Sequence, residues 1–234
     1  MAKAKDTNAP KGKKTQAGKK MSEIEIRDQL IAAMLVHVPF DGWGEACLRS
    51  GAEDAGMSFD EAKAILPNDA AAIDAFTDFA DREMARSLDQ MDPRPEKISA
   101  IIRASILCRL ENAEPHREAV AQGLKILARP QHAQIAASTL YRTVDRMWRL
   151  TGDRAVDFSF YTKRATLAGV YSATLLYWVA NPNADRAATE AFLDGRLREV
   201  AMIPKVTAPA KKAAEMGVKL AGKFLGRMPM RRHS

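Results

Sequence analysis

The side chains that most often carry out chemistry are few in this chain and lie far apart. The 234 residues include four histidines and two cysteines. Zinc and redox sites usually show short, fixed ligand spacings, such as CxxC or HExxH. No such spacing occurs among the candidates, which are His37, His116, His132, His233, Cys47 and Cys108. The pattern predicts neither a metal site nor a disulfide framework, and we expect no bound cofactor.

Acidic residues and catalytic motifs lead to the same expectation. Glu111 and Glu114 lack the Glu-x-x-His partner that a carboxylate-bridged di-iron bundle requires. The chain has no GxGxxG, P-loop or Gly-x-Ser-x-Gly motif. We interpret Asp145 and Arg146 as part of a solvated helix face. The sequence therefore predicts a protein without catalytic activity of its own.

The positive charge is concentrated at the two ends of the chain. Residues 1–20 carry a net charge of +6 and residues 205–234 carry +7, which leaves −6 for residues 21–204 of a chain whose total is +7. We predict a disordered basic tail over residues 1–21. The acidic body argues against a general nucleic-acid surface. The absence of a signal peptide and of a CxxC motif favours a reducing cytoplasm.

Hydrophobic spacing predicts helices throughout, and no stretch alternates like a strand over five residues. The sequences Ser22-x-x-Glu25 and Ser58-x-x-Glu61 match the capping-box pattern that starts a helix. A turn is expected at residues 39–42, after the first helix. The fold class is therefore all-α, with helices expected at 22–37, 43–55, 59–66, 70–91, 96–111, 115–129, 131–150, 157–178 and 189–202.

The first helices have the spacing of a helix-turn-helix unit, and we assign residues 22–91 to this subdomain. A DNA-binding unit needs cationic groups for the phosphates. Residues 41–74 instead contain eight acidic and two basic residues, a net charge of −6. Such a surface repels DNA. A small helical subdomain with no ancestral DNA-binding role fits these charges equally well.

The stretch over residues 157–178 organises the rest of the chain. It begins with an aromatic and basic cluster, and after Arg164 no charge appears until Asp185. A helix that is apolar on nearly all sides lies in a core or spans a membrane. This apolar run ends at Asn181-Pro182, short of the roughly 20 residues that a span needs. We predict a core helix within a larger domain over residues 92–204.

Residues 208–226 form a separate amphipathic pattern within the segment 205–234. Lysines occupy one arc of the helical wheel, and methionine, leucine and phenylalanine occupy the opposite arc. This pattern is typical of a helix that lies in a membrane interface. Docking of the same helix on its own protein is the alternative. The candidate membrane-binding residues are Lys212, Met216, Lys219, Leu220, Lys223, Phe224 and Leu225.

Several motifs within residues 24–204 also match a known pattern. They are Phe40-Asp41-Gly42-Trp43, Met147-Trp148, Asp157-Phe158-x-x-Tyr161-Thr162-Lys163-Arg164, Thr174-Leu175-Leu176-Tyr177-Trp178 and Thr189-x-x-Phe192-Leu193-Asp194-x-Arg196. These motifs resemble the signature of the ninth coenzyme Q biosynthesis protein family, in a bacterial form. The resemblance implies a fold similar to TetR-type regulators, with a larger ligand-binding domain that forms a homodimer.

The resemblance also implies a function. Members of the family bind isoprenoid quinones or phospholipids in an apolar cavity, without binding DNA, and support the demethoxyubiquinone hydroxylase as their partner. Helix faces and the resemblance together give the lipid-binding candidates Ile101, Ile102, Ile106, Met147, Leu167, Tyr171, Leu175 and Trp178. The resemblance alone gives the partner-binding candidates Met147, Trp148, Phe160, Tyr161 and Arg164.

The resulting hypothesis is a non-catalytic, lipid-binding accessory protein of ubiquinone biosynthesis. It would work in the cytoplasm, peripherally on the inner face of the cytoplasmic membrane. A TetR-type, ligand-responsive transcription regulator is the first alternative, and the acidic charge of residues 41–74 argues against it. A structural helical protein whose C-terminal helix docks internally is the second.

Overall fold

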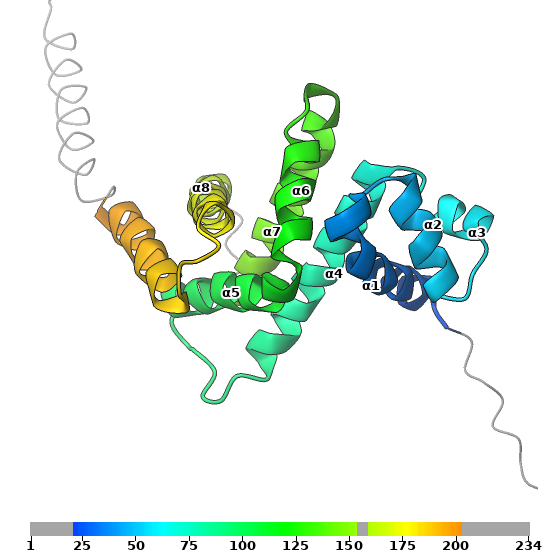
Figure 1. Ribbon diagram of the computed structural model, residues 1–234. Helices are drawn as coiled ribbons and strands as arrows, with labels where there is room; N and C mark the ends of the chain where they lie inside the picture. The colour runs from blue at the N-terminus through cyan, green and yellow to red at the C-terminus, as the bar shows by residue number, and fades with distance from the viewer. Residues whose placement is uncertain (1–20, 154–158, 203–234) are drawn as a thin grey trace, which may run out of the picture.

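The computed structural model describes residues 21–153 and 159–202, and every regular element in these ranges is a helix (Figure 1). This finding confirms the all-α prediction. Two short 3-10 helices, η1 (Glu114–His116) and η2 (Pro130–His132), precede α6 and α7, and residues 186–202 form one further helix. The α-helices are α1 (Glu23–Asp41), α2 (Glu45–Asp54), α3 (Phe59–Ile65), α4 (Asp69–Asp89), α5 (Ile98–Ala113), α6 (Arg117–Leu127), α7 (Ala133–Arg149) and α8 (Ser159–Ala180).

Both predicted capping boxes are present. The hydroxyl of Ser22 accepts a hydrogen bond from the backbone N–H of Glu25, and Ser58 does the same for Glu61. In each pair the glutamate side chain accepts the backbone N–H of the serine in return. Each serine therefore satisfies a donor that the first helical turn leaves without a partner.

The predicted end of the first helix is wrong. Helix α1 continues through Pro39 to Asp41, where the sequence predicted a turn. Proline removes one backbone donor but does not prevent the helix from continuing for a further half turn. The helix ends at Gly42, whose φ of +67° is open to glycine and whose N–H donates to the carbonyl of Val38.

Helices α1, α2 and α3 form a compact module at one end of the molecule (Figure 1). Its apolar core also takes in part of α4 and Ala119 of α6. Gly51 lets α2 approach α1 closely, because an added Cβ would lie 3.0 Å from the backbone nitrogen of Met34. Trp43 joins the module to α6, since its indole Nε1 donates to the carbonyl oxygen of Ala119 at 2.9 Å.

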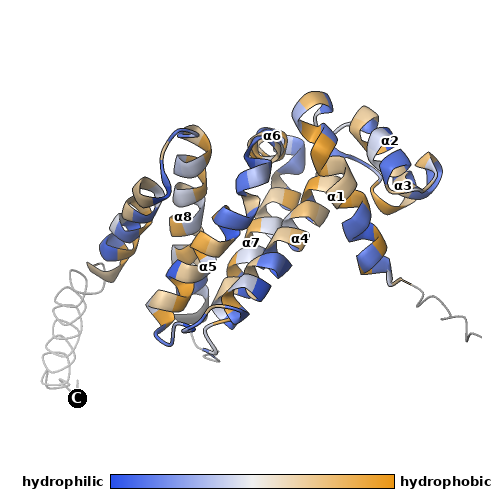
Figure 2. Cartoon of the chain, turned by 60° about the horizontal axis from the view of Figure 1, so that its bottom comes forward, coloured by the Kyte–Doolittle hydropathy of each residue, from blue (hydrophilic) through white to orange (hydrophobic). Residues whose placement is uncertain are grey.

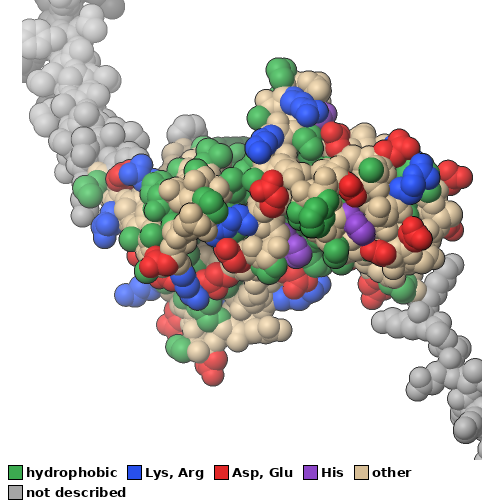
Figure 3. Space-filling model, viewed as in Figure 1, with side chains coloured by type: hydrophobic (Ala, Val, Ile, Leu, Met, Phe, Trp, Pro, Cys, Tyr) green, Lys and Arg blue, Asp and Glu red, His purple; other side chains and the backbone are tan. Residues whose placement is uncertain are grey.

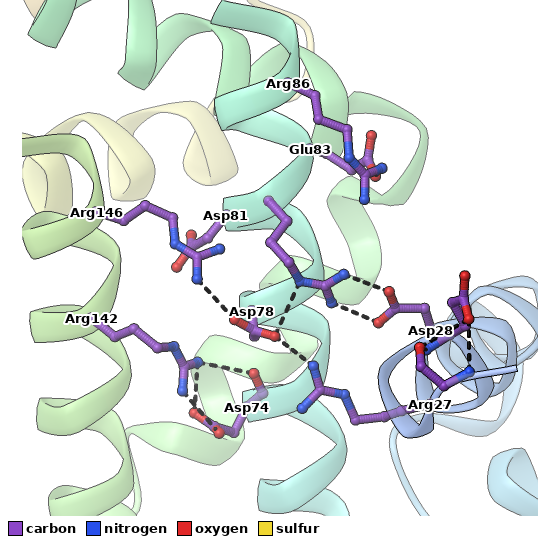
Figure 4. Close-up of polar contacts among 12 residues, drawn as sticks. Arg27, Asp28, Asp74, Asp78, Asp81, Glu83, Arg86, Arg142 and Arg146 are labelled. Atoms are coloured by element: carbon purple, nitrogen blue, oxygen red, sulfur yellow. Dashed lines mark hydrogen bonds and ion pairs between the residues drawn. The ribbon is translucent and has the colours of Figure 1, made fainter. Parts of the chain in front are cut away.

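Helix α4 runs from this module into the other half, and a chain of ion pairs joins the two along it (Figure 4). Asp78 of α4 accepts from Arg27 of α1 and from Arg146 of α7. One helical turn earlier, Asp74 accepts from Arg142 of α7 at 2.9 Å. The contacts join α1, α4 and α7, so the module is tied to the second half rather than hinged freely.

The second half contains a separate apolar core with α8 along one side. Helix α8 carries orange and pale residues along the side seen in Figure 2 and contributes Leu167, Val170, Tyr171, Leu175 and Trp178 to this core. The prediction of a core helix is therefore confirmed. The predicted tails lie outside the described residues, except for Met21.

Candidate functional site

One cavity, lined mostly by apolar side chains, lies between α4, α5, α6, α7 and α8 and has a volume of about 340 Å³. Most of its lining is apolar, from Val120 and Leu124 of α6 and Leu140 of α7 to Leu175 and Leu176 of α8. Small ligands usually occupy cavities of about 300–1,000 Å³ lined mainly by apolar groups. This cavity therefore has the size and surface of a ligand site, at the smaller end of the range.

The cavity includes two of the eight predicted lipid-binding residues, Tyr171 and Leu175. Ile101 is buried but does not line it. The other predicted residues belong to the packed core beside the cavity: Ile102, Ile106, Met147, Leu167 and Trp178. The role of each residue in lipid binding stays a prediction.

Sequence reasoning missed the walls contributed by α4, α6 and α7. They include Phe76, Val120, Gly123, Leu124, Ala136 and Leu140. The apolar spacing of each helix showed that it had a buried face. It did not show that these faces enclose a space, because a cavity is a property of five helices together. The Ala and Gly content of α6 and α7 was the one available signal.

A polar group lies at the buried end of the cavity. Arg109 is 6% exposed and lines the cavity, whereas Asp81 is fully buried behind it. The guanidinium Nε of Arg109 donates to Oδ1 of Asp81 at 2.8 Å, and the hydroxyl of Thr143 donates to Oδ2 at 2.8 Å. The guanidinium also lies 5.5 Å from the ring centre of Tyr171. Burial raises the pKa of the Tyr171 phenol above its ordinary value of 10.

A second hollow of about 400 Å³ lies on the other side of Trp178 and is lined by charged groups. The indole Nε1 of Trp178 donates to Oε2 of Glu114 at 2.9 Å. The guanidinium of Arg117 lies 4.3 Å from the centre of the same ring. Trp178 thus closes the apolar core on one side and has polar neighbours on the other.

The predicted partner-binding residues occupy different environments. Tyr161 is 71% exposed at the start of α8, and Trp148 is half-buried with Lys163 over its ring at 5.5 Å. Met147 is fully buried and Arg164 is 6% exposed. The side chain of Phe160 lies outside the described residues. Of the described four, Tyr161 and Trp148 are the two that a partner could reach from the surface.

The interpretation of Asp145 as part of a solvated helix face is wrong. Its side chain is 13% exposed and accepts hydrogen bonds from Arg164 at 2.8 Å and from Arg149 at 2.6 Å. Burial opposes ionisation of Asp145, but these two arginines outweigh it and lower the pKa of the carboxyl. Asp145 therefore holds the N-terminal part of α8 against α7.

The cysteines lie in environments that suppress thiolate chemistry. Burial raises the pKa of the Cys47 thiol to about 12, and burial also raises that of Cys108. A thiol must ionise to act as a nucleophile. Among the described residues, no group of three or more His, Cys, Asp or Glu side chains is placed to hold a metal ion.

The predicted membrane-binding residues of 205–234 lie outside the described residues. Within the described ranges, no helix combines the length and the apolar character that a membrane span requires. The described structure therefore places no membrane-spanning helix in residues 21–153 or 159–202.

Comparison with known proteins relates the chain to one family. The sequence model of the COQ9 family matches residues 133–204. The rat protein named "Ubiquinone biosynthesis protein COQ9, mitochondrial" is 28% identical over 201 residues, which cover 83% of this chain and 64% of the rat protein. The protein of the same name from Drosophila melanogaster is 29% identical over 187 residues, covering 76% of this chain and 56% of that protein. The chain thus spans less than two thirds of the length of these relatives.

A solved structure supports the fold. The TetR transcriptional regulator from Nitrosomonas europaea superposes with a TM-score of 0.61 at 24% identity, over 75% of this chain and 98% of that chain. This likeness confirms the TetR-like architecture, and at that identity it shows the fold alone. The family match covers α7, α8 and the following helix, and so includes one wall of the cavity. Together with the similarities to the rat and Drosophila proteins, it makes this chain similar to the COQ9 family of ubiquinone biosynthesis proteins.

Proposed function

We propose that this protein is a non-catalytic lipid carrier of ubiquinone biosynthesis. It holds an isoprenoid quinone intermediate in the cavity beside α8 and presents it at the membrane to the demethoxyubiquinone hydroxylase. The observation that carries the proposal is the apolar cavity of about 340 Å³. Its α8 wall, with Tyr171 and Leu175, lies within the segment that matches the family.

The physical chemistry of the ligand supports a carrier. Each CH₂ group buried from water contributes about 0.8 kcal/mol, so an isoprenoid tail leaves the bilayer only for a comparably apolar environment. A cavity at the small end of the usual range holds the head and the first part of the tail. The exposed side chain of Leu176 at the rim leaves a path along which the remaining tail can continue.

The charge distribution supports work at a membrane surface. Residues 205–234 carry +7 and residues 1–20 carry +6, whereas residues 21–204 carry −6. Near an anionic membrane each cation contributes about 1 kcal/mol of attraction. Both ends would therefore hold the protein peripherally at the inner face of the cytoplasmic membrane, with the acidic body turned away from it.

Lipid binding in this cavity is tested by filling it. Ala136 of α7 lines the cavity, and its neighbour Ala137 is exposed and does not. Purified wild-type protein, Ala136→Phe and Ala137→Phe are extracted with organic solvent and the lipids are identified by mass spectrometry. We expect isoprenoids with the wild type and Ala137→Phe, and a several-fold loss with Ala136→Phe. Equal lipid content in all three would contradict binding at this site.

The partner contact is tested at the exposed residues of the α7–α8 region. Tyr161 is 71% exposed and Tyr141, on α7, is 50% exposed. We expect Tyr161→Ala to weaken binding of the purified demethoxyubiquinone hydroxylase and Tyr141→Ala to leave it unchanged. Titration by surface plasmon resonance measures both. A loss with Tyr141→Ala alone would place the contact elsewhere.

Membrane binding is tested by truncation. The full chain and a version ending at Pro204 are sedimented with vesicles of phosphatidylglycerol and phosphatidylcholine at low and high salt. We expect the full chain to sediment, with a loss on truncation and at high salt because the attraction is electrostatic. Equal sedimentation of both versions would exclude the C-terminal anchor. Analytical ultracentrifugation of the same samples tests the proposed homodimer.

A transcription regulator is the second candidate, because α1–α3 and the larger domain have the arrangement of a TetR regulator. The surface of the module argues against it. Asp60 and Glu61 are exposed on α3, and Figure 3 shows acidic side chains gathered over this end of the molecule. Salt-dependent binding of residues 21–204 to random duplex DNA would favour this second candidate.

A further inference from the structure

The cavity is polar at its buried end and apolar at its rim. Arg109, Thr139, Thr143 and Tyr171 are each at most 6% exposed and line the inner end. At the rim Leu176 is 57% exposed. A ligand with a polar head and an apolar tail fits this gradient in one orientation, with the head inward and the tail towards the rim.

Arg109 has unused donors at the inner end. Its Nε is hydrogen-bonded to Asp81, and within the described part of the chain neither Nη atom has a further hydrogen-bond partner. Arg109 lines the cavity, so its guanidinium is within reach of a ligand there. Buried cationic donors without an acceptor are costly, which favours a ligand that supplies one.

The two threonines of this end are already occupied. The Thr143 hydroxyl donates to Asp81 at 2.8 Å, and the Thr139 hydroxyl donates to Asp74 at 2.5 Å. Both threonines have thus committed their single donor. The guanidinium of Arg109 lies over the Tyr171 ring, 5.5 Å from its centre, and this contact leaves the phenol O–H uncommitted. Arg109 and Tyr171 therefore have donors left for a ligand, and those of Arg109 are the charged ones.

The charges decide which acceptor fits. Arg109 and Asp81 form an ion pair within the protein, so their formal charges cancel. An anionic head, such as a phosphate, would add a net negative charge in a buried site beside the Asp81 carboxylate. A neutral carbonyl oxygen accepts the same hydrogen bond without that penalty.

We propose that Arg109 is the head-group determinant of the cavity and that its Nη atoms donate to a carbonyl oxygen of a neutral, quinone-like ring. The tail then runs between Val120, Leu124 and Leu140 towards Leu176. This inference rests on the proposed carrier function and deepens it, because it sets the chemical class of the head and the direction in which the ligand enters.

Three probes with the same decyl tail separate the head-group assignment from the carrier proposal on which it rests. They are a dimethoxy-methyl-benzoquinone, a plain benzene ring and a phosphate monoester, each titrated against the full-length protein by calorimetry. A hydrogen bond to a charged group is worth about ten- to a hundredfold in affinity. We expect the quinone to bind at least about tenfold more tightly than decylbenzene and decyl phosphate.

The variants assign that preference to Arg109. Arg109→Met should remove the preference for the quinone and keep the affinity for decylbenzene. Since Arg109→Met leaves Asp81 unpaired and can unfold the protein, the double variant Arg109→Met/Asp81→Asn removes both charges and should behave in the same way. Arg103→Met is the matched control, because Arg103 lies on α5 but pairs with Asp194 and Glu190 outside the cavity.

The outcomes are distinct. Equal affinity of the wild type for all three probes would overturn the head-group assignment and leave the carrier proposal standing. Tighter binding of decyl phosphate would overturn the neutral-head assignment. A preference for the quinone that survives in the double variant would also overturn the role of Arg109. If none of the three probes binds, both proposals fail together.

Discussion

The α1–α3 module and the half that surrounds the cavity bury different kinds of side chain. In α1, α2 and α3 the buried residues are apolar or glycine. The buried polar residues of the described chain all lie after α3. They are Asp81, Ser105, Arg109, Thr139, Thr143, Arg164, Thr174 and Thr189. Buried charges cost free energy, and replacing a buried pair by apolar residues is often neutral or stabilising. The second half thus buries charged and hydroxyl groups that α1, α2 and α3 do not.

The largest effect should come from breaking the buried pair. Asp81→Ala leaves the Arg109 guanidinium without its partner, and we expect a loss of about 3–5 kcal/mol in the free energy of unfolding. Asp41→Ala in the module removes an exposed acid and should change it by less than about 0.5 kcal/mol. Urea unfolding monitored by circular dichroism measures both. Equal, small losses would remove the energetic contrast between the two halves.

Glycine substitutions test the close packing of the module. An added Cβ at Gly51 meets Met34, so Gly51→Ala should cost about 1–3 kcal/mol through overpacking. At Gly169 of α8 nothing lies within 4 Å, and Gly169→Ala should stabilise the helix by about 0.5–1 kcal/mol. Thermal unfolding of the two variants gives the comparison. Destabilisation by Gly169→Ala would indicate that the exposed face of α8 is covered in solution, as in the proposed homodimer.

The ion pairs between the two halves predict sensitivity to acid. Burial opposes ionisation of Asp78, but the hydrogen bond from Arg27 and the charges of Arg82, Arg27 and Arg146 lower its pKa below the ordinary 3.8. A lowered folded-state pKa contributes stability that is complete above the unfolded pKa and is lost as the pH falls below it. We expect the free energy of unfolding to fall below about pH 4. The decrease should be shallower in Asp78→Asn, and an unchanged slope would contradict this role.

Helix caps should give the smallest effects. Side-chain caps are present at α1, α3 and α4, whereas α5, α6 and α7 begin without one. Ser58→Ala should therefore cost about 1 kcal/mol. Lys97→Ser at the start of α5 should stabilise the protein by up to about 1 kcal/mol. Chemical unfolding resolves both changes, and a loss with Lys97→Ser would contradict the assignment of an open cap.

The sequence was most informative where structure depends on near neighbours. Ser22 and Ser58 identified two helix starts, because a capping box involves residues three positions apart. It failed at Pro39, where the lost hydrogen bond did not end α1. It failed again at Asp145, because the partner Arg164 lies on another helix and no local pattern reveals that pairing.

The candidate site shows the same division. Tyr171 and Leu175 could be selected because the face of α8 is visible in its spacing. Arg109 and Asp81 were not among the residues selected from the sequence. Their burial becomes apparent when α4, α5 and α7 are packed together. Charge pairing at such sequence separation has no signature in one chain.

The sequence by itself determined the all-helical class, the central apolar helix, the acidic module and the basic ends, since each follows from composition and from the period of one helix. The tertiary structure alone decided where a cavity remains and which polar atoms face it. Side-chain spacing fixes the face that each helix buries, whereas a cavity is the volume left between five helices. That volume depends on how they cross and on which side chains meet there.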